Sequence, residues 1–203
     1  MSGKSDLDEI LGEIAHLAPA GYFLGLHIRF TSPLMTIQTF PQPWIDAYTA
    51  QGYALRDPVV ACGFGQEAPS RWSEIEIPDP FGILEEAASH GLRFGVVVPM
   101  GELRSRTIGS VARSDREFSD AEIAVLSHHI RRLHKLTQPP ERLTEAQLTA
   151  LRYIAEGDRH LAAAAKLNIS ESALKARLTA ARDKLFARTT AEAIQRAKDY
   201  GLL

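Results

Sequence analysis

Hydrophobic residues near the start of the chain recur every three or four positions. Leu7, Ile10 and Ile14 follow this spacing, and Pro19 stands just beyond the end of the pattern. Such a period places apolar side chains on one face of a helix, and proline is unfavourable inside a helix. The pattern predicts an amphipathic helix over residues 5–17.

Apolar and polar residues alternate in the next part of the chain. Residues 22–30 alternate, a Thr-Ser-Pro turn follows, and residues 34–40 return with side chains that favour strands. A second pair of β-rich segments, 94–100 and 107–112, flanks a polar loop. These patterns predict two antiparallel hairpins. One face of the first strand should carry every second residue: Leu24, Leu26, Ile28 and Phe30.

Three further segments are typical of helices. Residues 44–51 follow two prolines, and residues 79–91 begin with Asp-Pro and end at a glycine, the usual order of proline and glycine at helix ends. Ser119-x-x-Glu122 is a capping box, after which apolar residues recur at helical spacing to Leu133. Together with the hairpins, these segments predict an α+β domain, an α/β/α sandwich around an antiparallel sheet.

After two adjacent prolines the pattern is helical to the end of the chain. The capping box Thr144-x-x-Gln147 begins one helix. Residues 158–167 and a longer helix from Ser170 lie on either side of a tight turn, and one more helix follows. Two short helices across a tight turn are the helix-turn-helix pattern. The predicted parts are a sensor domain at 1–138, a linker at 139–142 and an all-α four-helix domain at 143–203.

The helix that begins at Ser170 has two different sides. Leu174 and Leu178 belong to its core side. Its outward side combines small and hydroxyl-bearing residues at the centre with basic residues at the edges. Short side chains allow a helix to approach the bases of the major groove, and basic side chains reach phosphates. The candidate DNA contacts are Ser172, Lys175, Arg177, Thr179 and Arg182, with an ordinary solvated helix face as the alternative.

Charge divides the chain at the same place as the secondary structure. Residues 1–138 carry 12 Lys and Arg against 17 Asp and Glu, a net charge of −5. Residues 139–203 carry 11 against 8, a net charge of +3. A basic domain beside an acidic one suggests that the basic domain meets a polyanion, and DNA is the polyanion that a helix-turn-helix binds.

Composition and motifs exclude several kinds of function. No nucleophile with a base, cluster of metal ligands or phosphate-binding loop is recognisable, so we expect no enzyme, cofactor or metal site. Cys62 is the single cysteine, which excludes an internal disulfide. No apolar segment approaches the roughly 20 residues that span a bilayer, and the first residues lack the apolar core of a signal peptide. We therefore expect a cytoplasmic protein that does not enter membranes.

From residue 143 onward the sequence resembles the LuxR-type DNA-binding domain. The resemblance is carried by Leu143-Thr144, Ala155-Glu156-Gly157, Ile169-Ser170, Lys175, Lys184-Leu185 and Gly201-Leu202. Two segments depart from the family pattern. Leu161-Ala162-Ala163 stands where Lys-Glu-Ile is typical, and Ala173-Leu174 stands where Thr-Val is typical. We expect a homodimer, which would place two such helices about 34 Å apart and bind an inverted repeat in DNA.

The preceding part resembles the acyl-homoserine-lactone-binding domain of quorum-sensing regulators. Its signature is Trp44-x3-Tyr48-x8-Asp57-Pro58-Val59-Val60, then Trp72, then Gly91-x3-Gly95-x3-Pro99. The resemblance implies that Trp44 donates its indole N–H to the lactone carbonyl and Tyr48 its hydroxyl to the acyl carbonyl. It further implies that Asp57 accepts the amide N–H and that Trp72 packs against the lactone ring.

A Ser or Thr on the last strand is also implied by this resemblance as a ligand contact. The family's Ser or Thr aligns with Ala112, which has no hydroxyl. Ser110 lies two residues earlier, on the same face of the strand, so Ser110 is the candidate. An acyl chain would add burial of roughly 0.8 kcal/mol per CH₂, while a few polar groups orient the head group. An aryl ligand stays open as an alternative.

The sequence thus predicts a transcription regulator whose DNA binding is controlled by an N-acyl-homoserine lactone or a related small signal. Two alternatives stay open. One is an interaction protein with weakened DNA binding that sequesters another regulator, as the altered second helix of the DNA-binding domain suggests. The other is an orphan regulator that needs no ligand.

Overall fold

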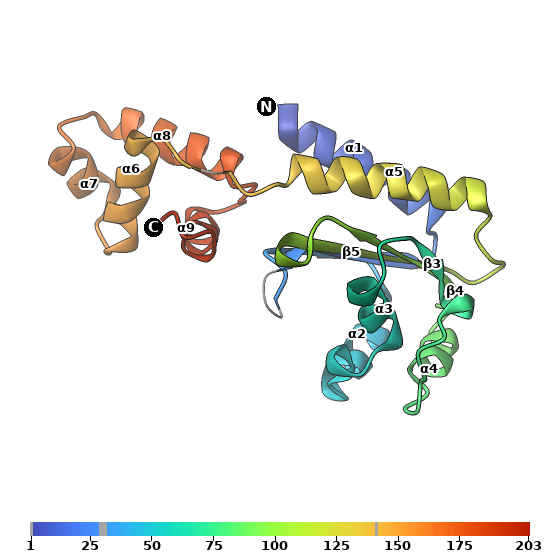
Figure 1. Ribbon diagram of the computed structural model, residues 1–203. Helices are drawn as coiled ribbons and strands as arrows, with labels where there is room; N and C mark the ends of the chain where they lie inside the picture. Colours follow the sequence, from blue (N-terminus) through green and yellow to red (C-terminus); the bar gives the residue numbers. More distant parts are fainter. Residues whose placement is uncertain (1, 29–31, 141) are drawn as a thin grey trace. The chain divides into compact units, whose positions relative to one another are not determined.

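The computed structural model describes residues 2–28, 32–140 and 142–203 (Figure 1). The chain separates into two compact units. Residues 7–136 form one unit, and residues 137–203 with the first six residues form the other. The larger unit combines strands and helices, whereas the smaller one contains the last four helices.

One antiparallel sheet organises the larger unit. Its strands, as far as the chain is described, are β1 (Gly21–Ile28), β2 (Met35–Gln38), β3 (Ser70–Arg71), β4 (Phe94–Met100) and β5 (Arg106–Arg113). Their order across the sheet is β2-β1-β5-β4-β3, and every neighbouring pair is antiparallel. Both predicted hairpins are confirmed, and they meet where β1 pairs with β5. The short strand β3 was not predicted.

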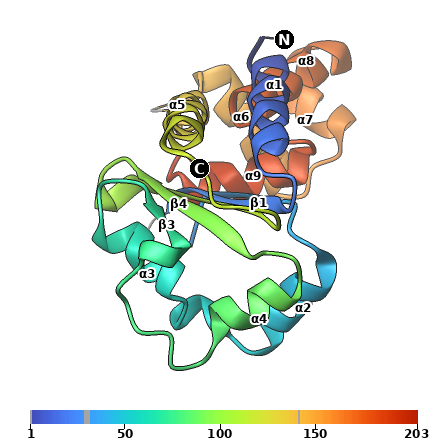
Figure 2. The ribbon, with the colours of Figure 1, turned by 90° about the vertical axis from the view of Figure 1, so that its right-hand side faces the viewer.

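Helices cover both faces of the sheet (Figures 1 and 2). Helices α1 (Ser2–Leu17) and α5 (Asp120–Leu136) lie on one face. The other face carries α2 (Gln42–Ala50), α3 (Pro58–Gly65) and α4 (Ile83–Ser89). The observed arrangement confirms the predicted α+β class and the helices on either side of an antiparallel sheet.

Helix α5 packs closely on the sheet. Its apolar residues Leu126, Ile130 and Leu133 are fully buried. A Cβ at Gly109 of β5 would lie 2.5 Å from the Cδ1 atom of Ile130, so the helix approaches the strand where a side chain is missing. The predicted capping box begins this helix, because the Ser119 backbone N–H donates to Glu122 Oε2 at 2.8 Å.

Strand β1 departs from simple alternation. Leu24 lies beside Ile130 on the α5 face, whereas Ile28 lines a cavity on the opposite face. The pairing with β5 shifts register between Gly25 and Ile28, and His27 has a φ of 51°. A bulge adds one residue and turns the following side chains to the other face. The prediction that Ile28 shares the face of Leu24 is therefore wrong, and Phe30 lies outside the described residues.

Helix α4 begins later than predicted. We expected it to start at Asp79-Pro80, but its first residue is Ile83 and its N-cap is Gly82, with a φ of 65°. The Asp79 carboxylate still caps the helix, since it accepts the backbone N–H groups of Ile83 at 3.0 Å and Leu84 at 2.9 Å. The acidic residue satisfies the free N–H groups from outside the helix.

Residues 142–203 of the smaller unit form four short helices. They are α6 (Glu145–Ala155), α7 (His160–Lys166), α8 (Glu171–Lys184) and α9 (Thr190–Asp199). Thr144, Ser170 and Thr189 each cap the helix that follows. Much of the core is alanine, which lets the helices approach closely; these alanines are Ala150, Ala163, Ala164, Ala181, Ala193 and Ala197. None of the described helices is long and apolar enough to cross a membrane.

Candidate functional site

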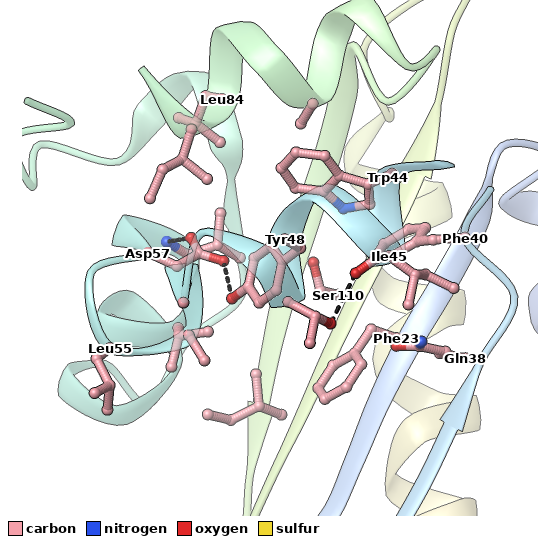
Figure 3. A pocket seen from close by; sticks show the side chains of 18 of the residues that line it. Phe23, Gln38, Phe40, Trp44, Ile45, Tyr48, Leu55, Asp57, Leu84 and Ser110 are labelled. Atoms are coloured by element: carbon pink, nitrogen blue, oxygen red, sulfur yellow. Dashed lines mark hydrogen bonds between the residues drawn. The ribbon is translucent and has the colours of Figure 1, made fainter. Parts of the chain in front are cut away.

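A cavity of about 540 Å³ lies between the sheet and the helices α2, α3 and α4 (Figure 3). Strands β1, β2 and β5 contribute Phe23, Gln38 and Ser110 to its lining. The walls are mostly apolar, with a few polar groups among them, and the volume falls in the range of small-molecule sites. Thr49 and Leu55 line the cavity and are exposed, so the cavity opens to solvent beside them.

Helix α2 directs two aromatic residues into this cavity. Trp44 and Tyr48 lie one turn apart on the same helix face. Their rings meet edge to face, with centroids 5.4 Å apart at an interplanar angle of 67°. Tyr53 and His90 contact the Trp44 ring from other elements, with centroids 6.3 and 5.8 Å away. These contacts fix the indole, which Figure 3 shows turned into the cavity.

Asp57 is both a lining residue and the N-cap of α3. Its Oδ1 atom accepts the backbone N–H of Val59 at 2.7 Å, and Pro58 occupies the first helical position. Its Oδ2 atom accepts the Tyr48 hydroxyl at 2.8 Å (Figure 3). Each carboxylate oxygen has a second lone pair, so the group can accept a further hydrogen bond from a ligand.

The two side chains perturb each other electrostatically. Burial raises the pKa of the Asp57 carboxyl, while hydrogen bonds from Tyr48 and from the Val59 backbone counteract part of that rise. Burial and the nearby Asp57 charge raise the pKa of Tyr48 far above its ordinary value. Tyr48 is therefore protonated at neutral pH, and its single hydrogen is directed at Asp57. Donation from Tyr48 to an acyl carbonyl stays a prediction, and it requires exchange of this bond.

Trp72 packs flat against β4 at a residue without a side chain. A Cβ at Gly95 would lie 2.2 Å from both Cδ2 and Cε2 of the indole, so no larger residue fits here without movement. Trp72 is 8% exposed, and within the described chain its indole N–H is buried without an acceptor. A buried donor without a partner is uncommon and destabilising.

Ser110 lies in the middle of the cavity floor. It pairs with Phe23 of β1 and Val97 of β4, and it is 7% exposed. Ala112 belongs to the adjoining core cluster, whereas Ser110 lines the cavity. The structure therefore brings five predicted ligand residues to one cavity: Trp44, Tyr48, Asp57, Trp72 and Ser110.

Sequence reasoning missed the wall formed by α4. Ile83, Leu84 and Ala87 line the cavity opposite α2. The Tyr53 hydroxyl donates to Glu86 Oε2 at 2.5 Å and ties the turn after α2 to this helix. The helical spacing of the α4 residues was visible in the sequence, but the pattern does not show which helix faces them.

A buried arginine holds the other end of α3. Arg106 Nε donates to the Gly63 carbonyl at 3.1 Å, and Nη1 donates to the Gly101 carbonyl at 2.6 Å. Carbonyl groups at a helix C-terminus carry partial negative charge and attract cations. Helix α3 is therefore fixed at its N-terminus by Asp57 and at its C-terminus by Arg106. No pattern in the sequence indicates this role of Arg106.

The candidate DNA contacts lie along α8. Ser172, Lys175 and Thr179 are exposed, whereas Arg177 and Arg182 are half-buried. Arg182 Nη2 donates to Thr179 Oγ1 at 2.9 Å, which joins an edge residue to a residue from the centre of the face.

Two other polar residues of this face also have partners within the protein. Lys175 Nζ lies 2.8 Å from Glu171 Oε1, and this ion pair lowers the pKa of Glu171. The Ser172 hydroxyl is 2.9 Å from the hydroxyl of Ser170. On the preceding helix, Leu161 is 72% exposed.

Comparison with known proteins places the larger unit in a family. Residues 21–138 match the autoinducer binding domain. The transcriptional activator VanR of Vibrio anguillarum is 28% identical over 97% of this chain and 90% of its own length. The transcriptional activator RaiR of Rhizobium etli is 30% identical over 80% of this chain and 74% of its own length. These relatives are regulators, which confirms the expectation of a protein that is not an enzyme.

Solved structures share the fold. Escherichia coli SdiA superposes with a TM-score of 0.54 at 22% identity, covering 100% of this chain and 92% of SdiA. A structure of SdiA in complex with octanoyl-rac-glycerol gives a TM-score of 0.53 at 22% identity, covering 98% of this chain and 88% of that one.

Proposed function

Because the chain belongs to the LuxR-type quorum-sensing regulators with an autoinducer-binding domain, we propose that it is a DNA-binding transcription regulator controlled by a small acyl signal. The signal is an N-acyl-homoserine lactone or a closely related compound. The observation that carries this proposal is the apolar cavity into which the Asp57 carboxylate, the Trp44 indole and the Ser110 hydroxyl converge. Apolar walls with a few convergent polar groups suit an amphipathic small molecule.

The polar groups suit an amide head group. Asp57 accepts the ligand amide N–H with a remaining lone pair, and Trp44 donates its indole N–H to the lactone carbonyl. Trp72 packs against the lactone ring, and Ser110 offers a hydroxyl from the cavity floor. Tyr48 orients Asp57 through the observed 2.8 Å hydrogen bond. The acyl chain lies along the apolar walls, where each buried CH₂ contributes about 0.8 kcal/mol.

The smaller unit supplies the DNA-binding function in this proposal. Helices α7 and α8 form the helix-turn-helix, and α8 enters the major groove. Ser172 and Thr179 face the bases, while the basic edge residues Lys175, Arg177 and Arg182 contact phosphates. The protein acts in the cytoplasm as a homodimer, and α5 contributes part of the dimer interface. Val125 supports that interface because it is a large apolar residue of α5 that is 45% exposed.

Selection from random DNA, with and without N-octanoyl-homoserine lactone, tests this function. We expect an enriched inverted repeat whose half-site centres lie about 34 Å apart, because a two-fold dimer places two recognition helices one turn apart. We also expect the lactone to change the amount of DNA recovered. Absence of an enriched sequence and of salt-dependent binding in both conditions would contradict the proposal.

A second candidate is a protein that sequesters another regulator. The 72% exposed Leu161 favours it, because an apolar residue occupies the first turn of the helix that precedes the recognition helix. Native mass spectrometry of the chain coexpressed with a LuxR-type regulator measures heterodimers directly. Heterodimers without any sequence-specific DNA complex would favour this candidate over the DNA-binding regulator.

A further inference from the structure

We propose that the stacked side chains of His27 and His134 make the protein sensitive to acid: at neutral pH they hold the last turn of α5 on the sheet, and protonation releases it. The inference goes beyond the proposed function, because it involves neither the cavity nor the DNA-binding helix. Helix α5 ends at Leu136, and the next helix begins at Glu145. Release of the last turn lengthens the segment that joins the two units, so acid loosens the link between them.

His27 is a buried imidazole at the bulge of β1, where it is 1% exposed. Its Nε2 atom lies 3.0 Å from the backbone carbonyl oxygen of His134, and its Nδ1 atom lies 2.9 Å from Ser105 Oγ. A carbonyl oxygen only accepts, so Nε2 carries a hydrogen and Nδ1 of the neutral ring accepts the Ser105 hydroxyl. The side chain therefore ties β1 to the last turn of α5 and to the turn before β5.

His134 supplies the second ring and is half-buried. The two imidazole centroids are 4.4 Å apart, with an interplanar angle of 30°. His134 Nδ1 lies 2.8 Å from Thr107 Oγ1, an oxygen that also accepts the His27 backbone N–H at 3.2 Å. A Cβ at Gly101 would lie 2.7 Å from His134 Cε1, so the backbone there covers the ring. Strands β1 and β5 and the residue after β4 thus enclose the side chain.

The described residues on the sheet side offer no free carboxylate to balance a proton on either ring. Strand β1 contains no Asp, Glu, Lys or Arg. On β5, Arg106 donates to the Gly101 carbonyl and adds a cation close to the pair. Glu102 and Arg104, in the turn between β4 and β5, form an ion pair at 2.9 Å, and their side chains are 74% and 86% exposed.

The helical side adds further cations. On α5, Arg131 and Lys135 are neighbours of His134 in the sequence, and both are exposed. The carboxylate of Glu9 on α1 lies 3.8 Å from the guanidinium of Arg132, which is its ion-pair partner. The charged groups around the two imidazoles therefore favour the neutral rings over the protonated ones.

A proton on either ring is unfavourable in this setting. Histidine ordinarily gains its charge between about pH 5 and 8. Burial disfavours the charged form and lowers the pKa of His134. Protonation of both rings would place two positive charges on imidazoles whose centroids are 4.4 Å apart. Acid therefore favours any arrangement in which the two rings separate and reach solvent.

The direction of the pH dependence follows from the lowered pKa. Unfolded His134 binds a proton at higher pH than His134 in the folded structure. The stabilisation is therefore complete well above the unfolded pKa of about 6.5 and is lost as the pH falls below that value. A local opening that frees the rings costs less than global unfolding. Acid should thus release the end of α5 before the protein unfolds.

Amide hydrogen exchange of the full, ligand-free chain tests the release at about pH 7 and about pH 5.5. The rates are corrected for the effect of pH on intrinsic exchange. We expect protection of residues 131–136 to fall at least about 5-fold at the lower pH, while protection around Leu126 in the middle of α5 stays nearly constant. In an NMR titration of the same protein, the imidazole of His134 should titrate at lower pH than that of His16, which is exposed on α1.

Two variants separate titration from packing. His134→Asn keeps an oxygen near the position of Nδ1 for Thr107 but cannot titrate, so the acid-induced loss of protection should largely disappear. His27→Asn suits the positive φ of 51° but removes the stacked ring, so the end of α5 should be less protected at both pH values. His16→Asn is the matched control, because it removes an exposed histidine from the last turn of α1 and should keep the wild-type response.

The outcomes decide the matter without ligand or DNA, so failure here leaves the proposed function untouched. An end of α5 that stays equally protected at the lower pH overturns the inference. An undiminished acid response in folded His134→Asn overturns it as well. If that variant does not fold, the titration of the wild type decides, and a His134 that titrates together with His16 or above it shows that the inference is wrong.

Discussion

The two units of this protein place their polar groups at different depths. In the larger unit Tyr48 and Asp57 are partly buried and hydrogen-bonded to each other, and their pKa values are raised. In the smaller unit the polar residues of α8 lie on an open face, and Lys175 and Thr179 are exposed. Changes that disturb the packing around the cavity should therefore alter stability and ligand binding together, whereas changes on α8 should alter binding alone.

Among the substitutions that test this difference between the units, one at Gly95 should change the free energy of unfolding most. Gly95→Ala places a Cβ about where the Trp72 indole lies, since the two would be 2.2 Å apart. We expect a loss of about 2–3 kcal/mol in the free energy of unfolding, measured in urea, together with loss of ligand-induced stabilisation. Gly12→Ala is the control, because a Cβ there meets nothing within 4 Å and should stabilise α1 by about 0.5–1 kcal/mol. Equal effects of the two substitutions would contradict the packing described.

A smaller effect is expected when one donor is removed from the cavity. Trp44→Phe keeps an aromatic ring beside Tyr48 but deletes the indole N–H. We expect about a 10-fold loss of lactone affinity in titration calorimetry, because a neutral hydrogen bond contributes roughly 1 kcal/mol. The urea unfolding of ligand-free protein should change little by comparison. A loss of ligand-free stability that accounts for the whole loss of binding would assign Trp44 to the core alone.

An ion-pair cluster at the start of α5 should give a pH-dependent effect on stability. Arg116 and Arg113 bind Glu122 at 2.7 and 3.0 Å, and the hydrogen bond from Arg116 is the main reason that the pKa of Glu122 is lowered. A lowered folded-state pKa means that the stabilisation is present above the unfolded pKa of about 4.3 and is lost as the pH falls below it.

Glu122→Gln tests this dependence. At neutral pH the variant should be less stable than the wild type by about 1 kcal/mol, and the difference should shrink steadily below about pH 5. Urea unfolding at neutral pH and at several acidic values measures it, with Glu67→Gln as a control at an exposed carboxylate. A difference that grows on acidification would show that the sign of the pKa shift is wrong.

Substitutions on α8 should change the stability of the protein least. Their effect should appear in DNA binding instead. Arg182→Ala should weaken binding to all sequences alike and lower the salt slope by about 1, because one phosphate contact is lost. Thr179→Val should change sequence preference instead. Since Arg182 donates to Thr179 at 2.9 Å, the two substitutions should not be additive. Fluorescence anisotropy at several salt concentrations measures both, and a change in preference without a change in slope for Arg182→Ala would refute its phosphate role.

Local signals predicted much of the fold. Hairpins and capping boxes depend on neighbouring residues, so Ser119-x-x-Glu122 and Thr144-x-x-Gln147 marked helix starts correctly. Helix α3 was missed although Asp57-Pro58 combines a good N-cap with a proline at the first helical position. The bulge at His27 carried no sequence signal, because a positive φ in a non-glycine residue depends on its tertiary surroundings.

The sequence predicted which residues line the site, but not the contacts between them. Family resemblance pointed to Trp44 and Asp57, and both line the cavity. The bond from Tyr48 to Asp57 and the packing of Trp72 on Gly95 depend on how α2, α3 and β4 meet in space. Such contacts between distant segments leave no periodic pattern in the sequence.

The double role of Asp57 also limits how this receptor can evolve. Its carboxyl group caps α3 through Val59 and lines the cavity. A substitution of Asp57 that suits a new signal therefore also affects the N-cap of α3. Asn, Ser and Thr retain capping ability, whereas Leu or Val lose it. As the protein evolves toward a different ligand, we expect Asp57 to be replaced first by one of these capping residues.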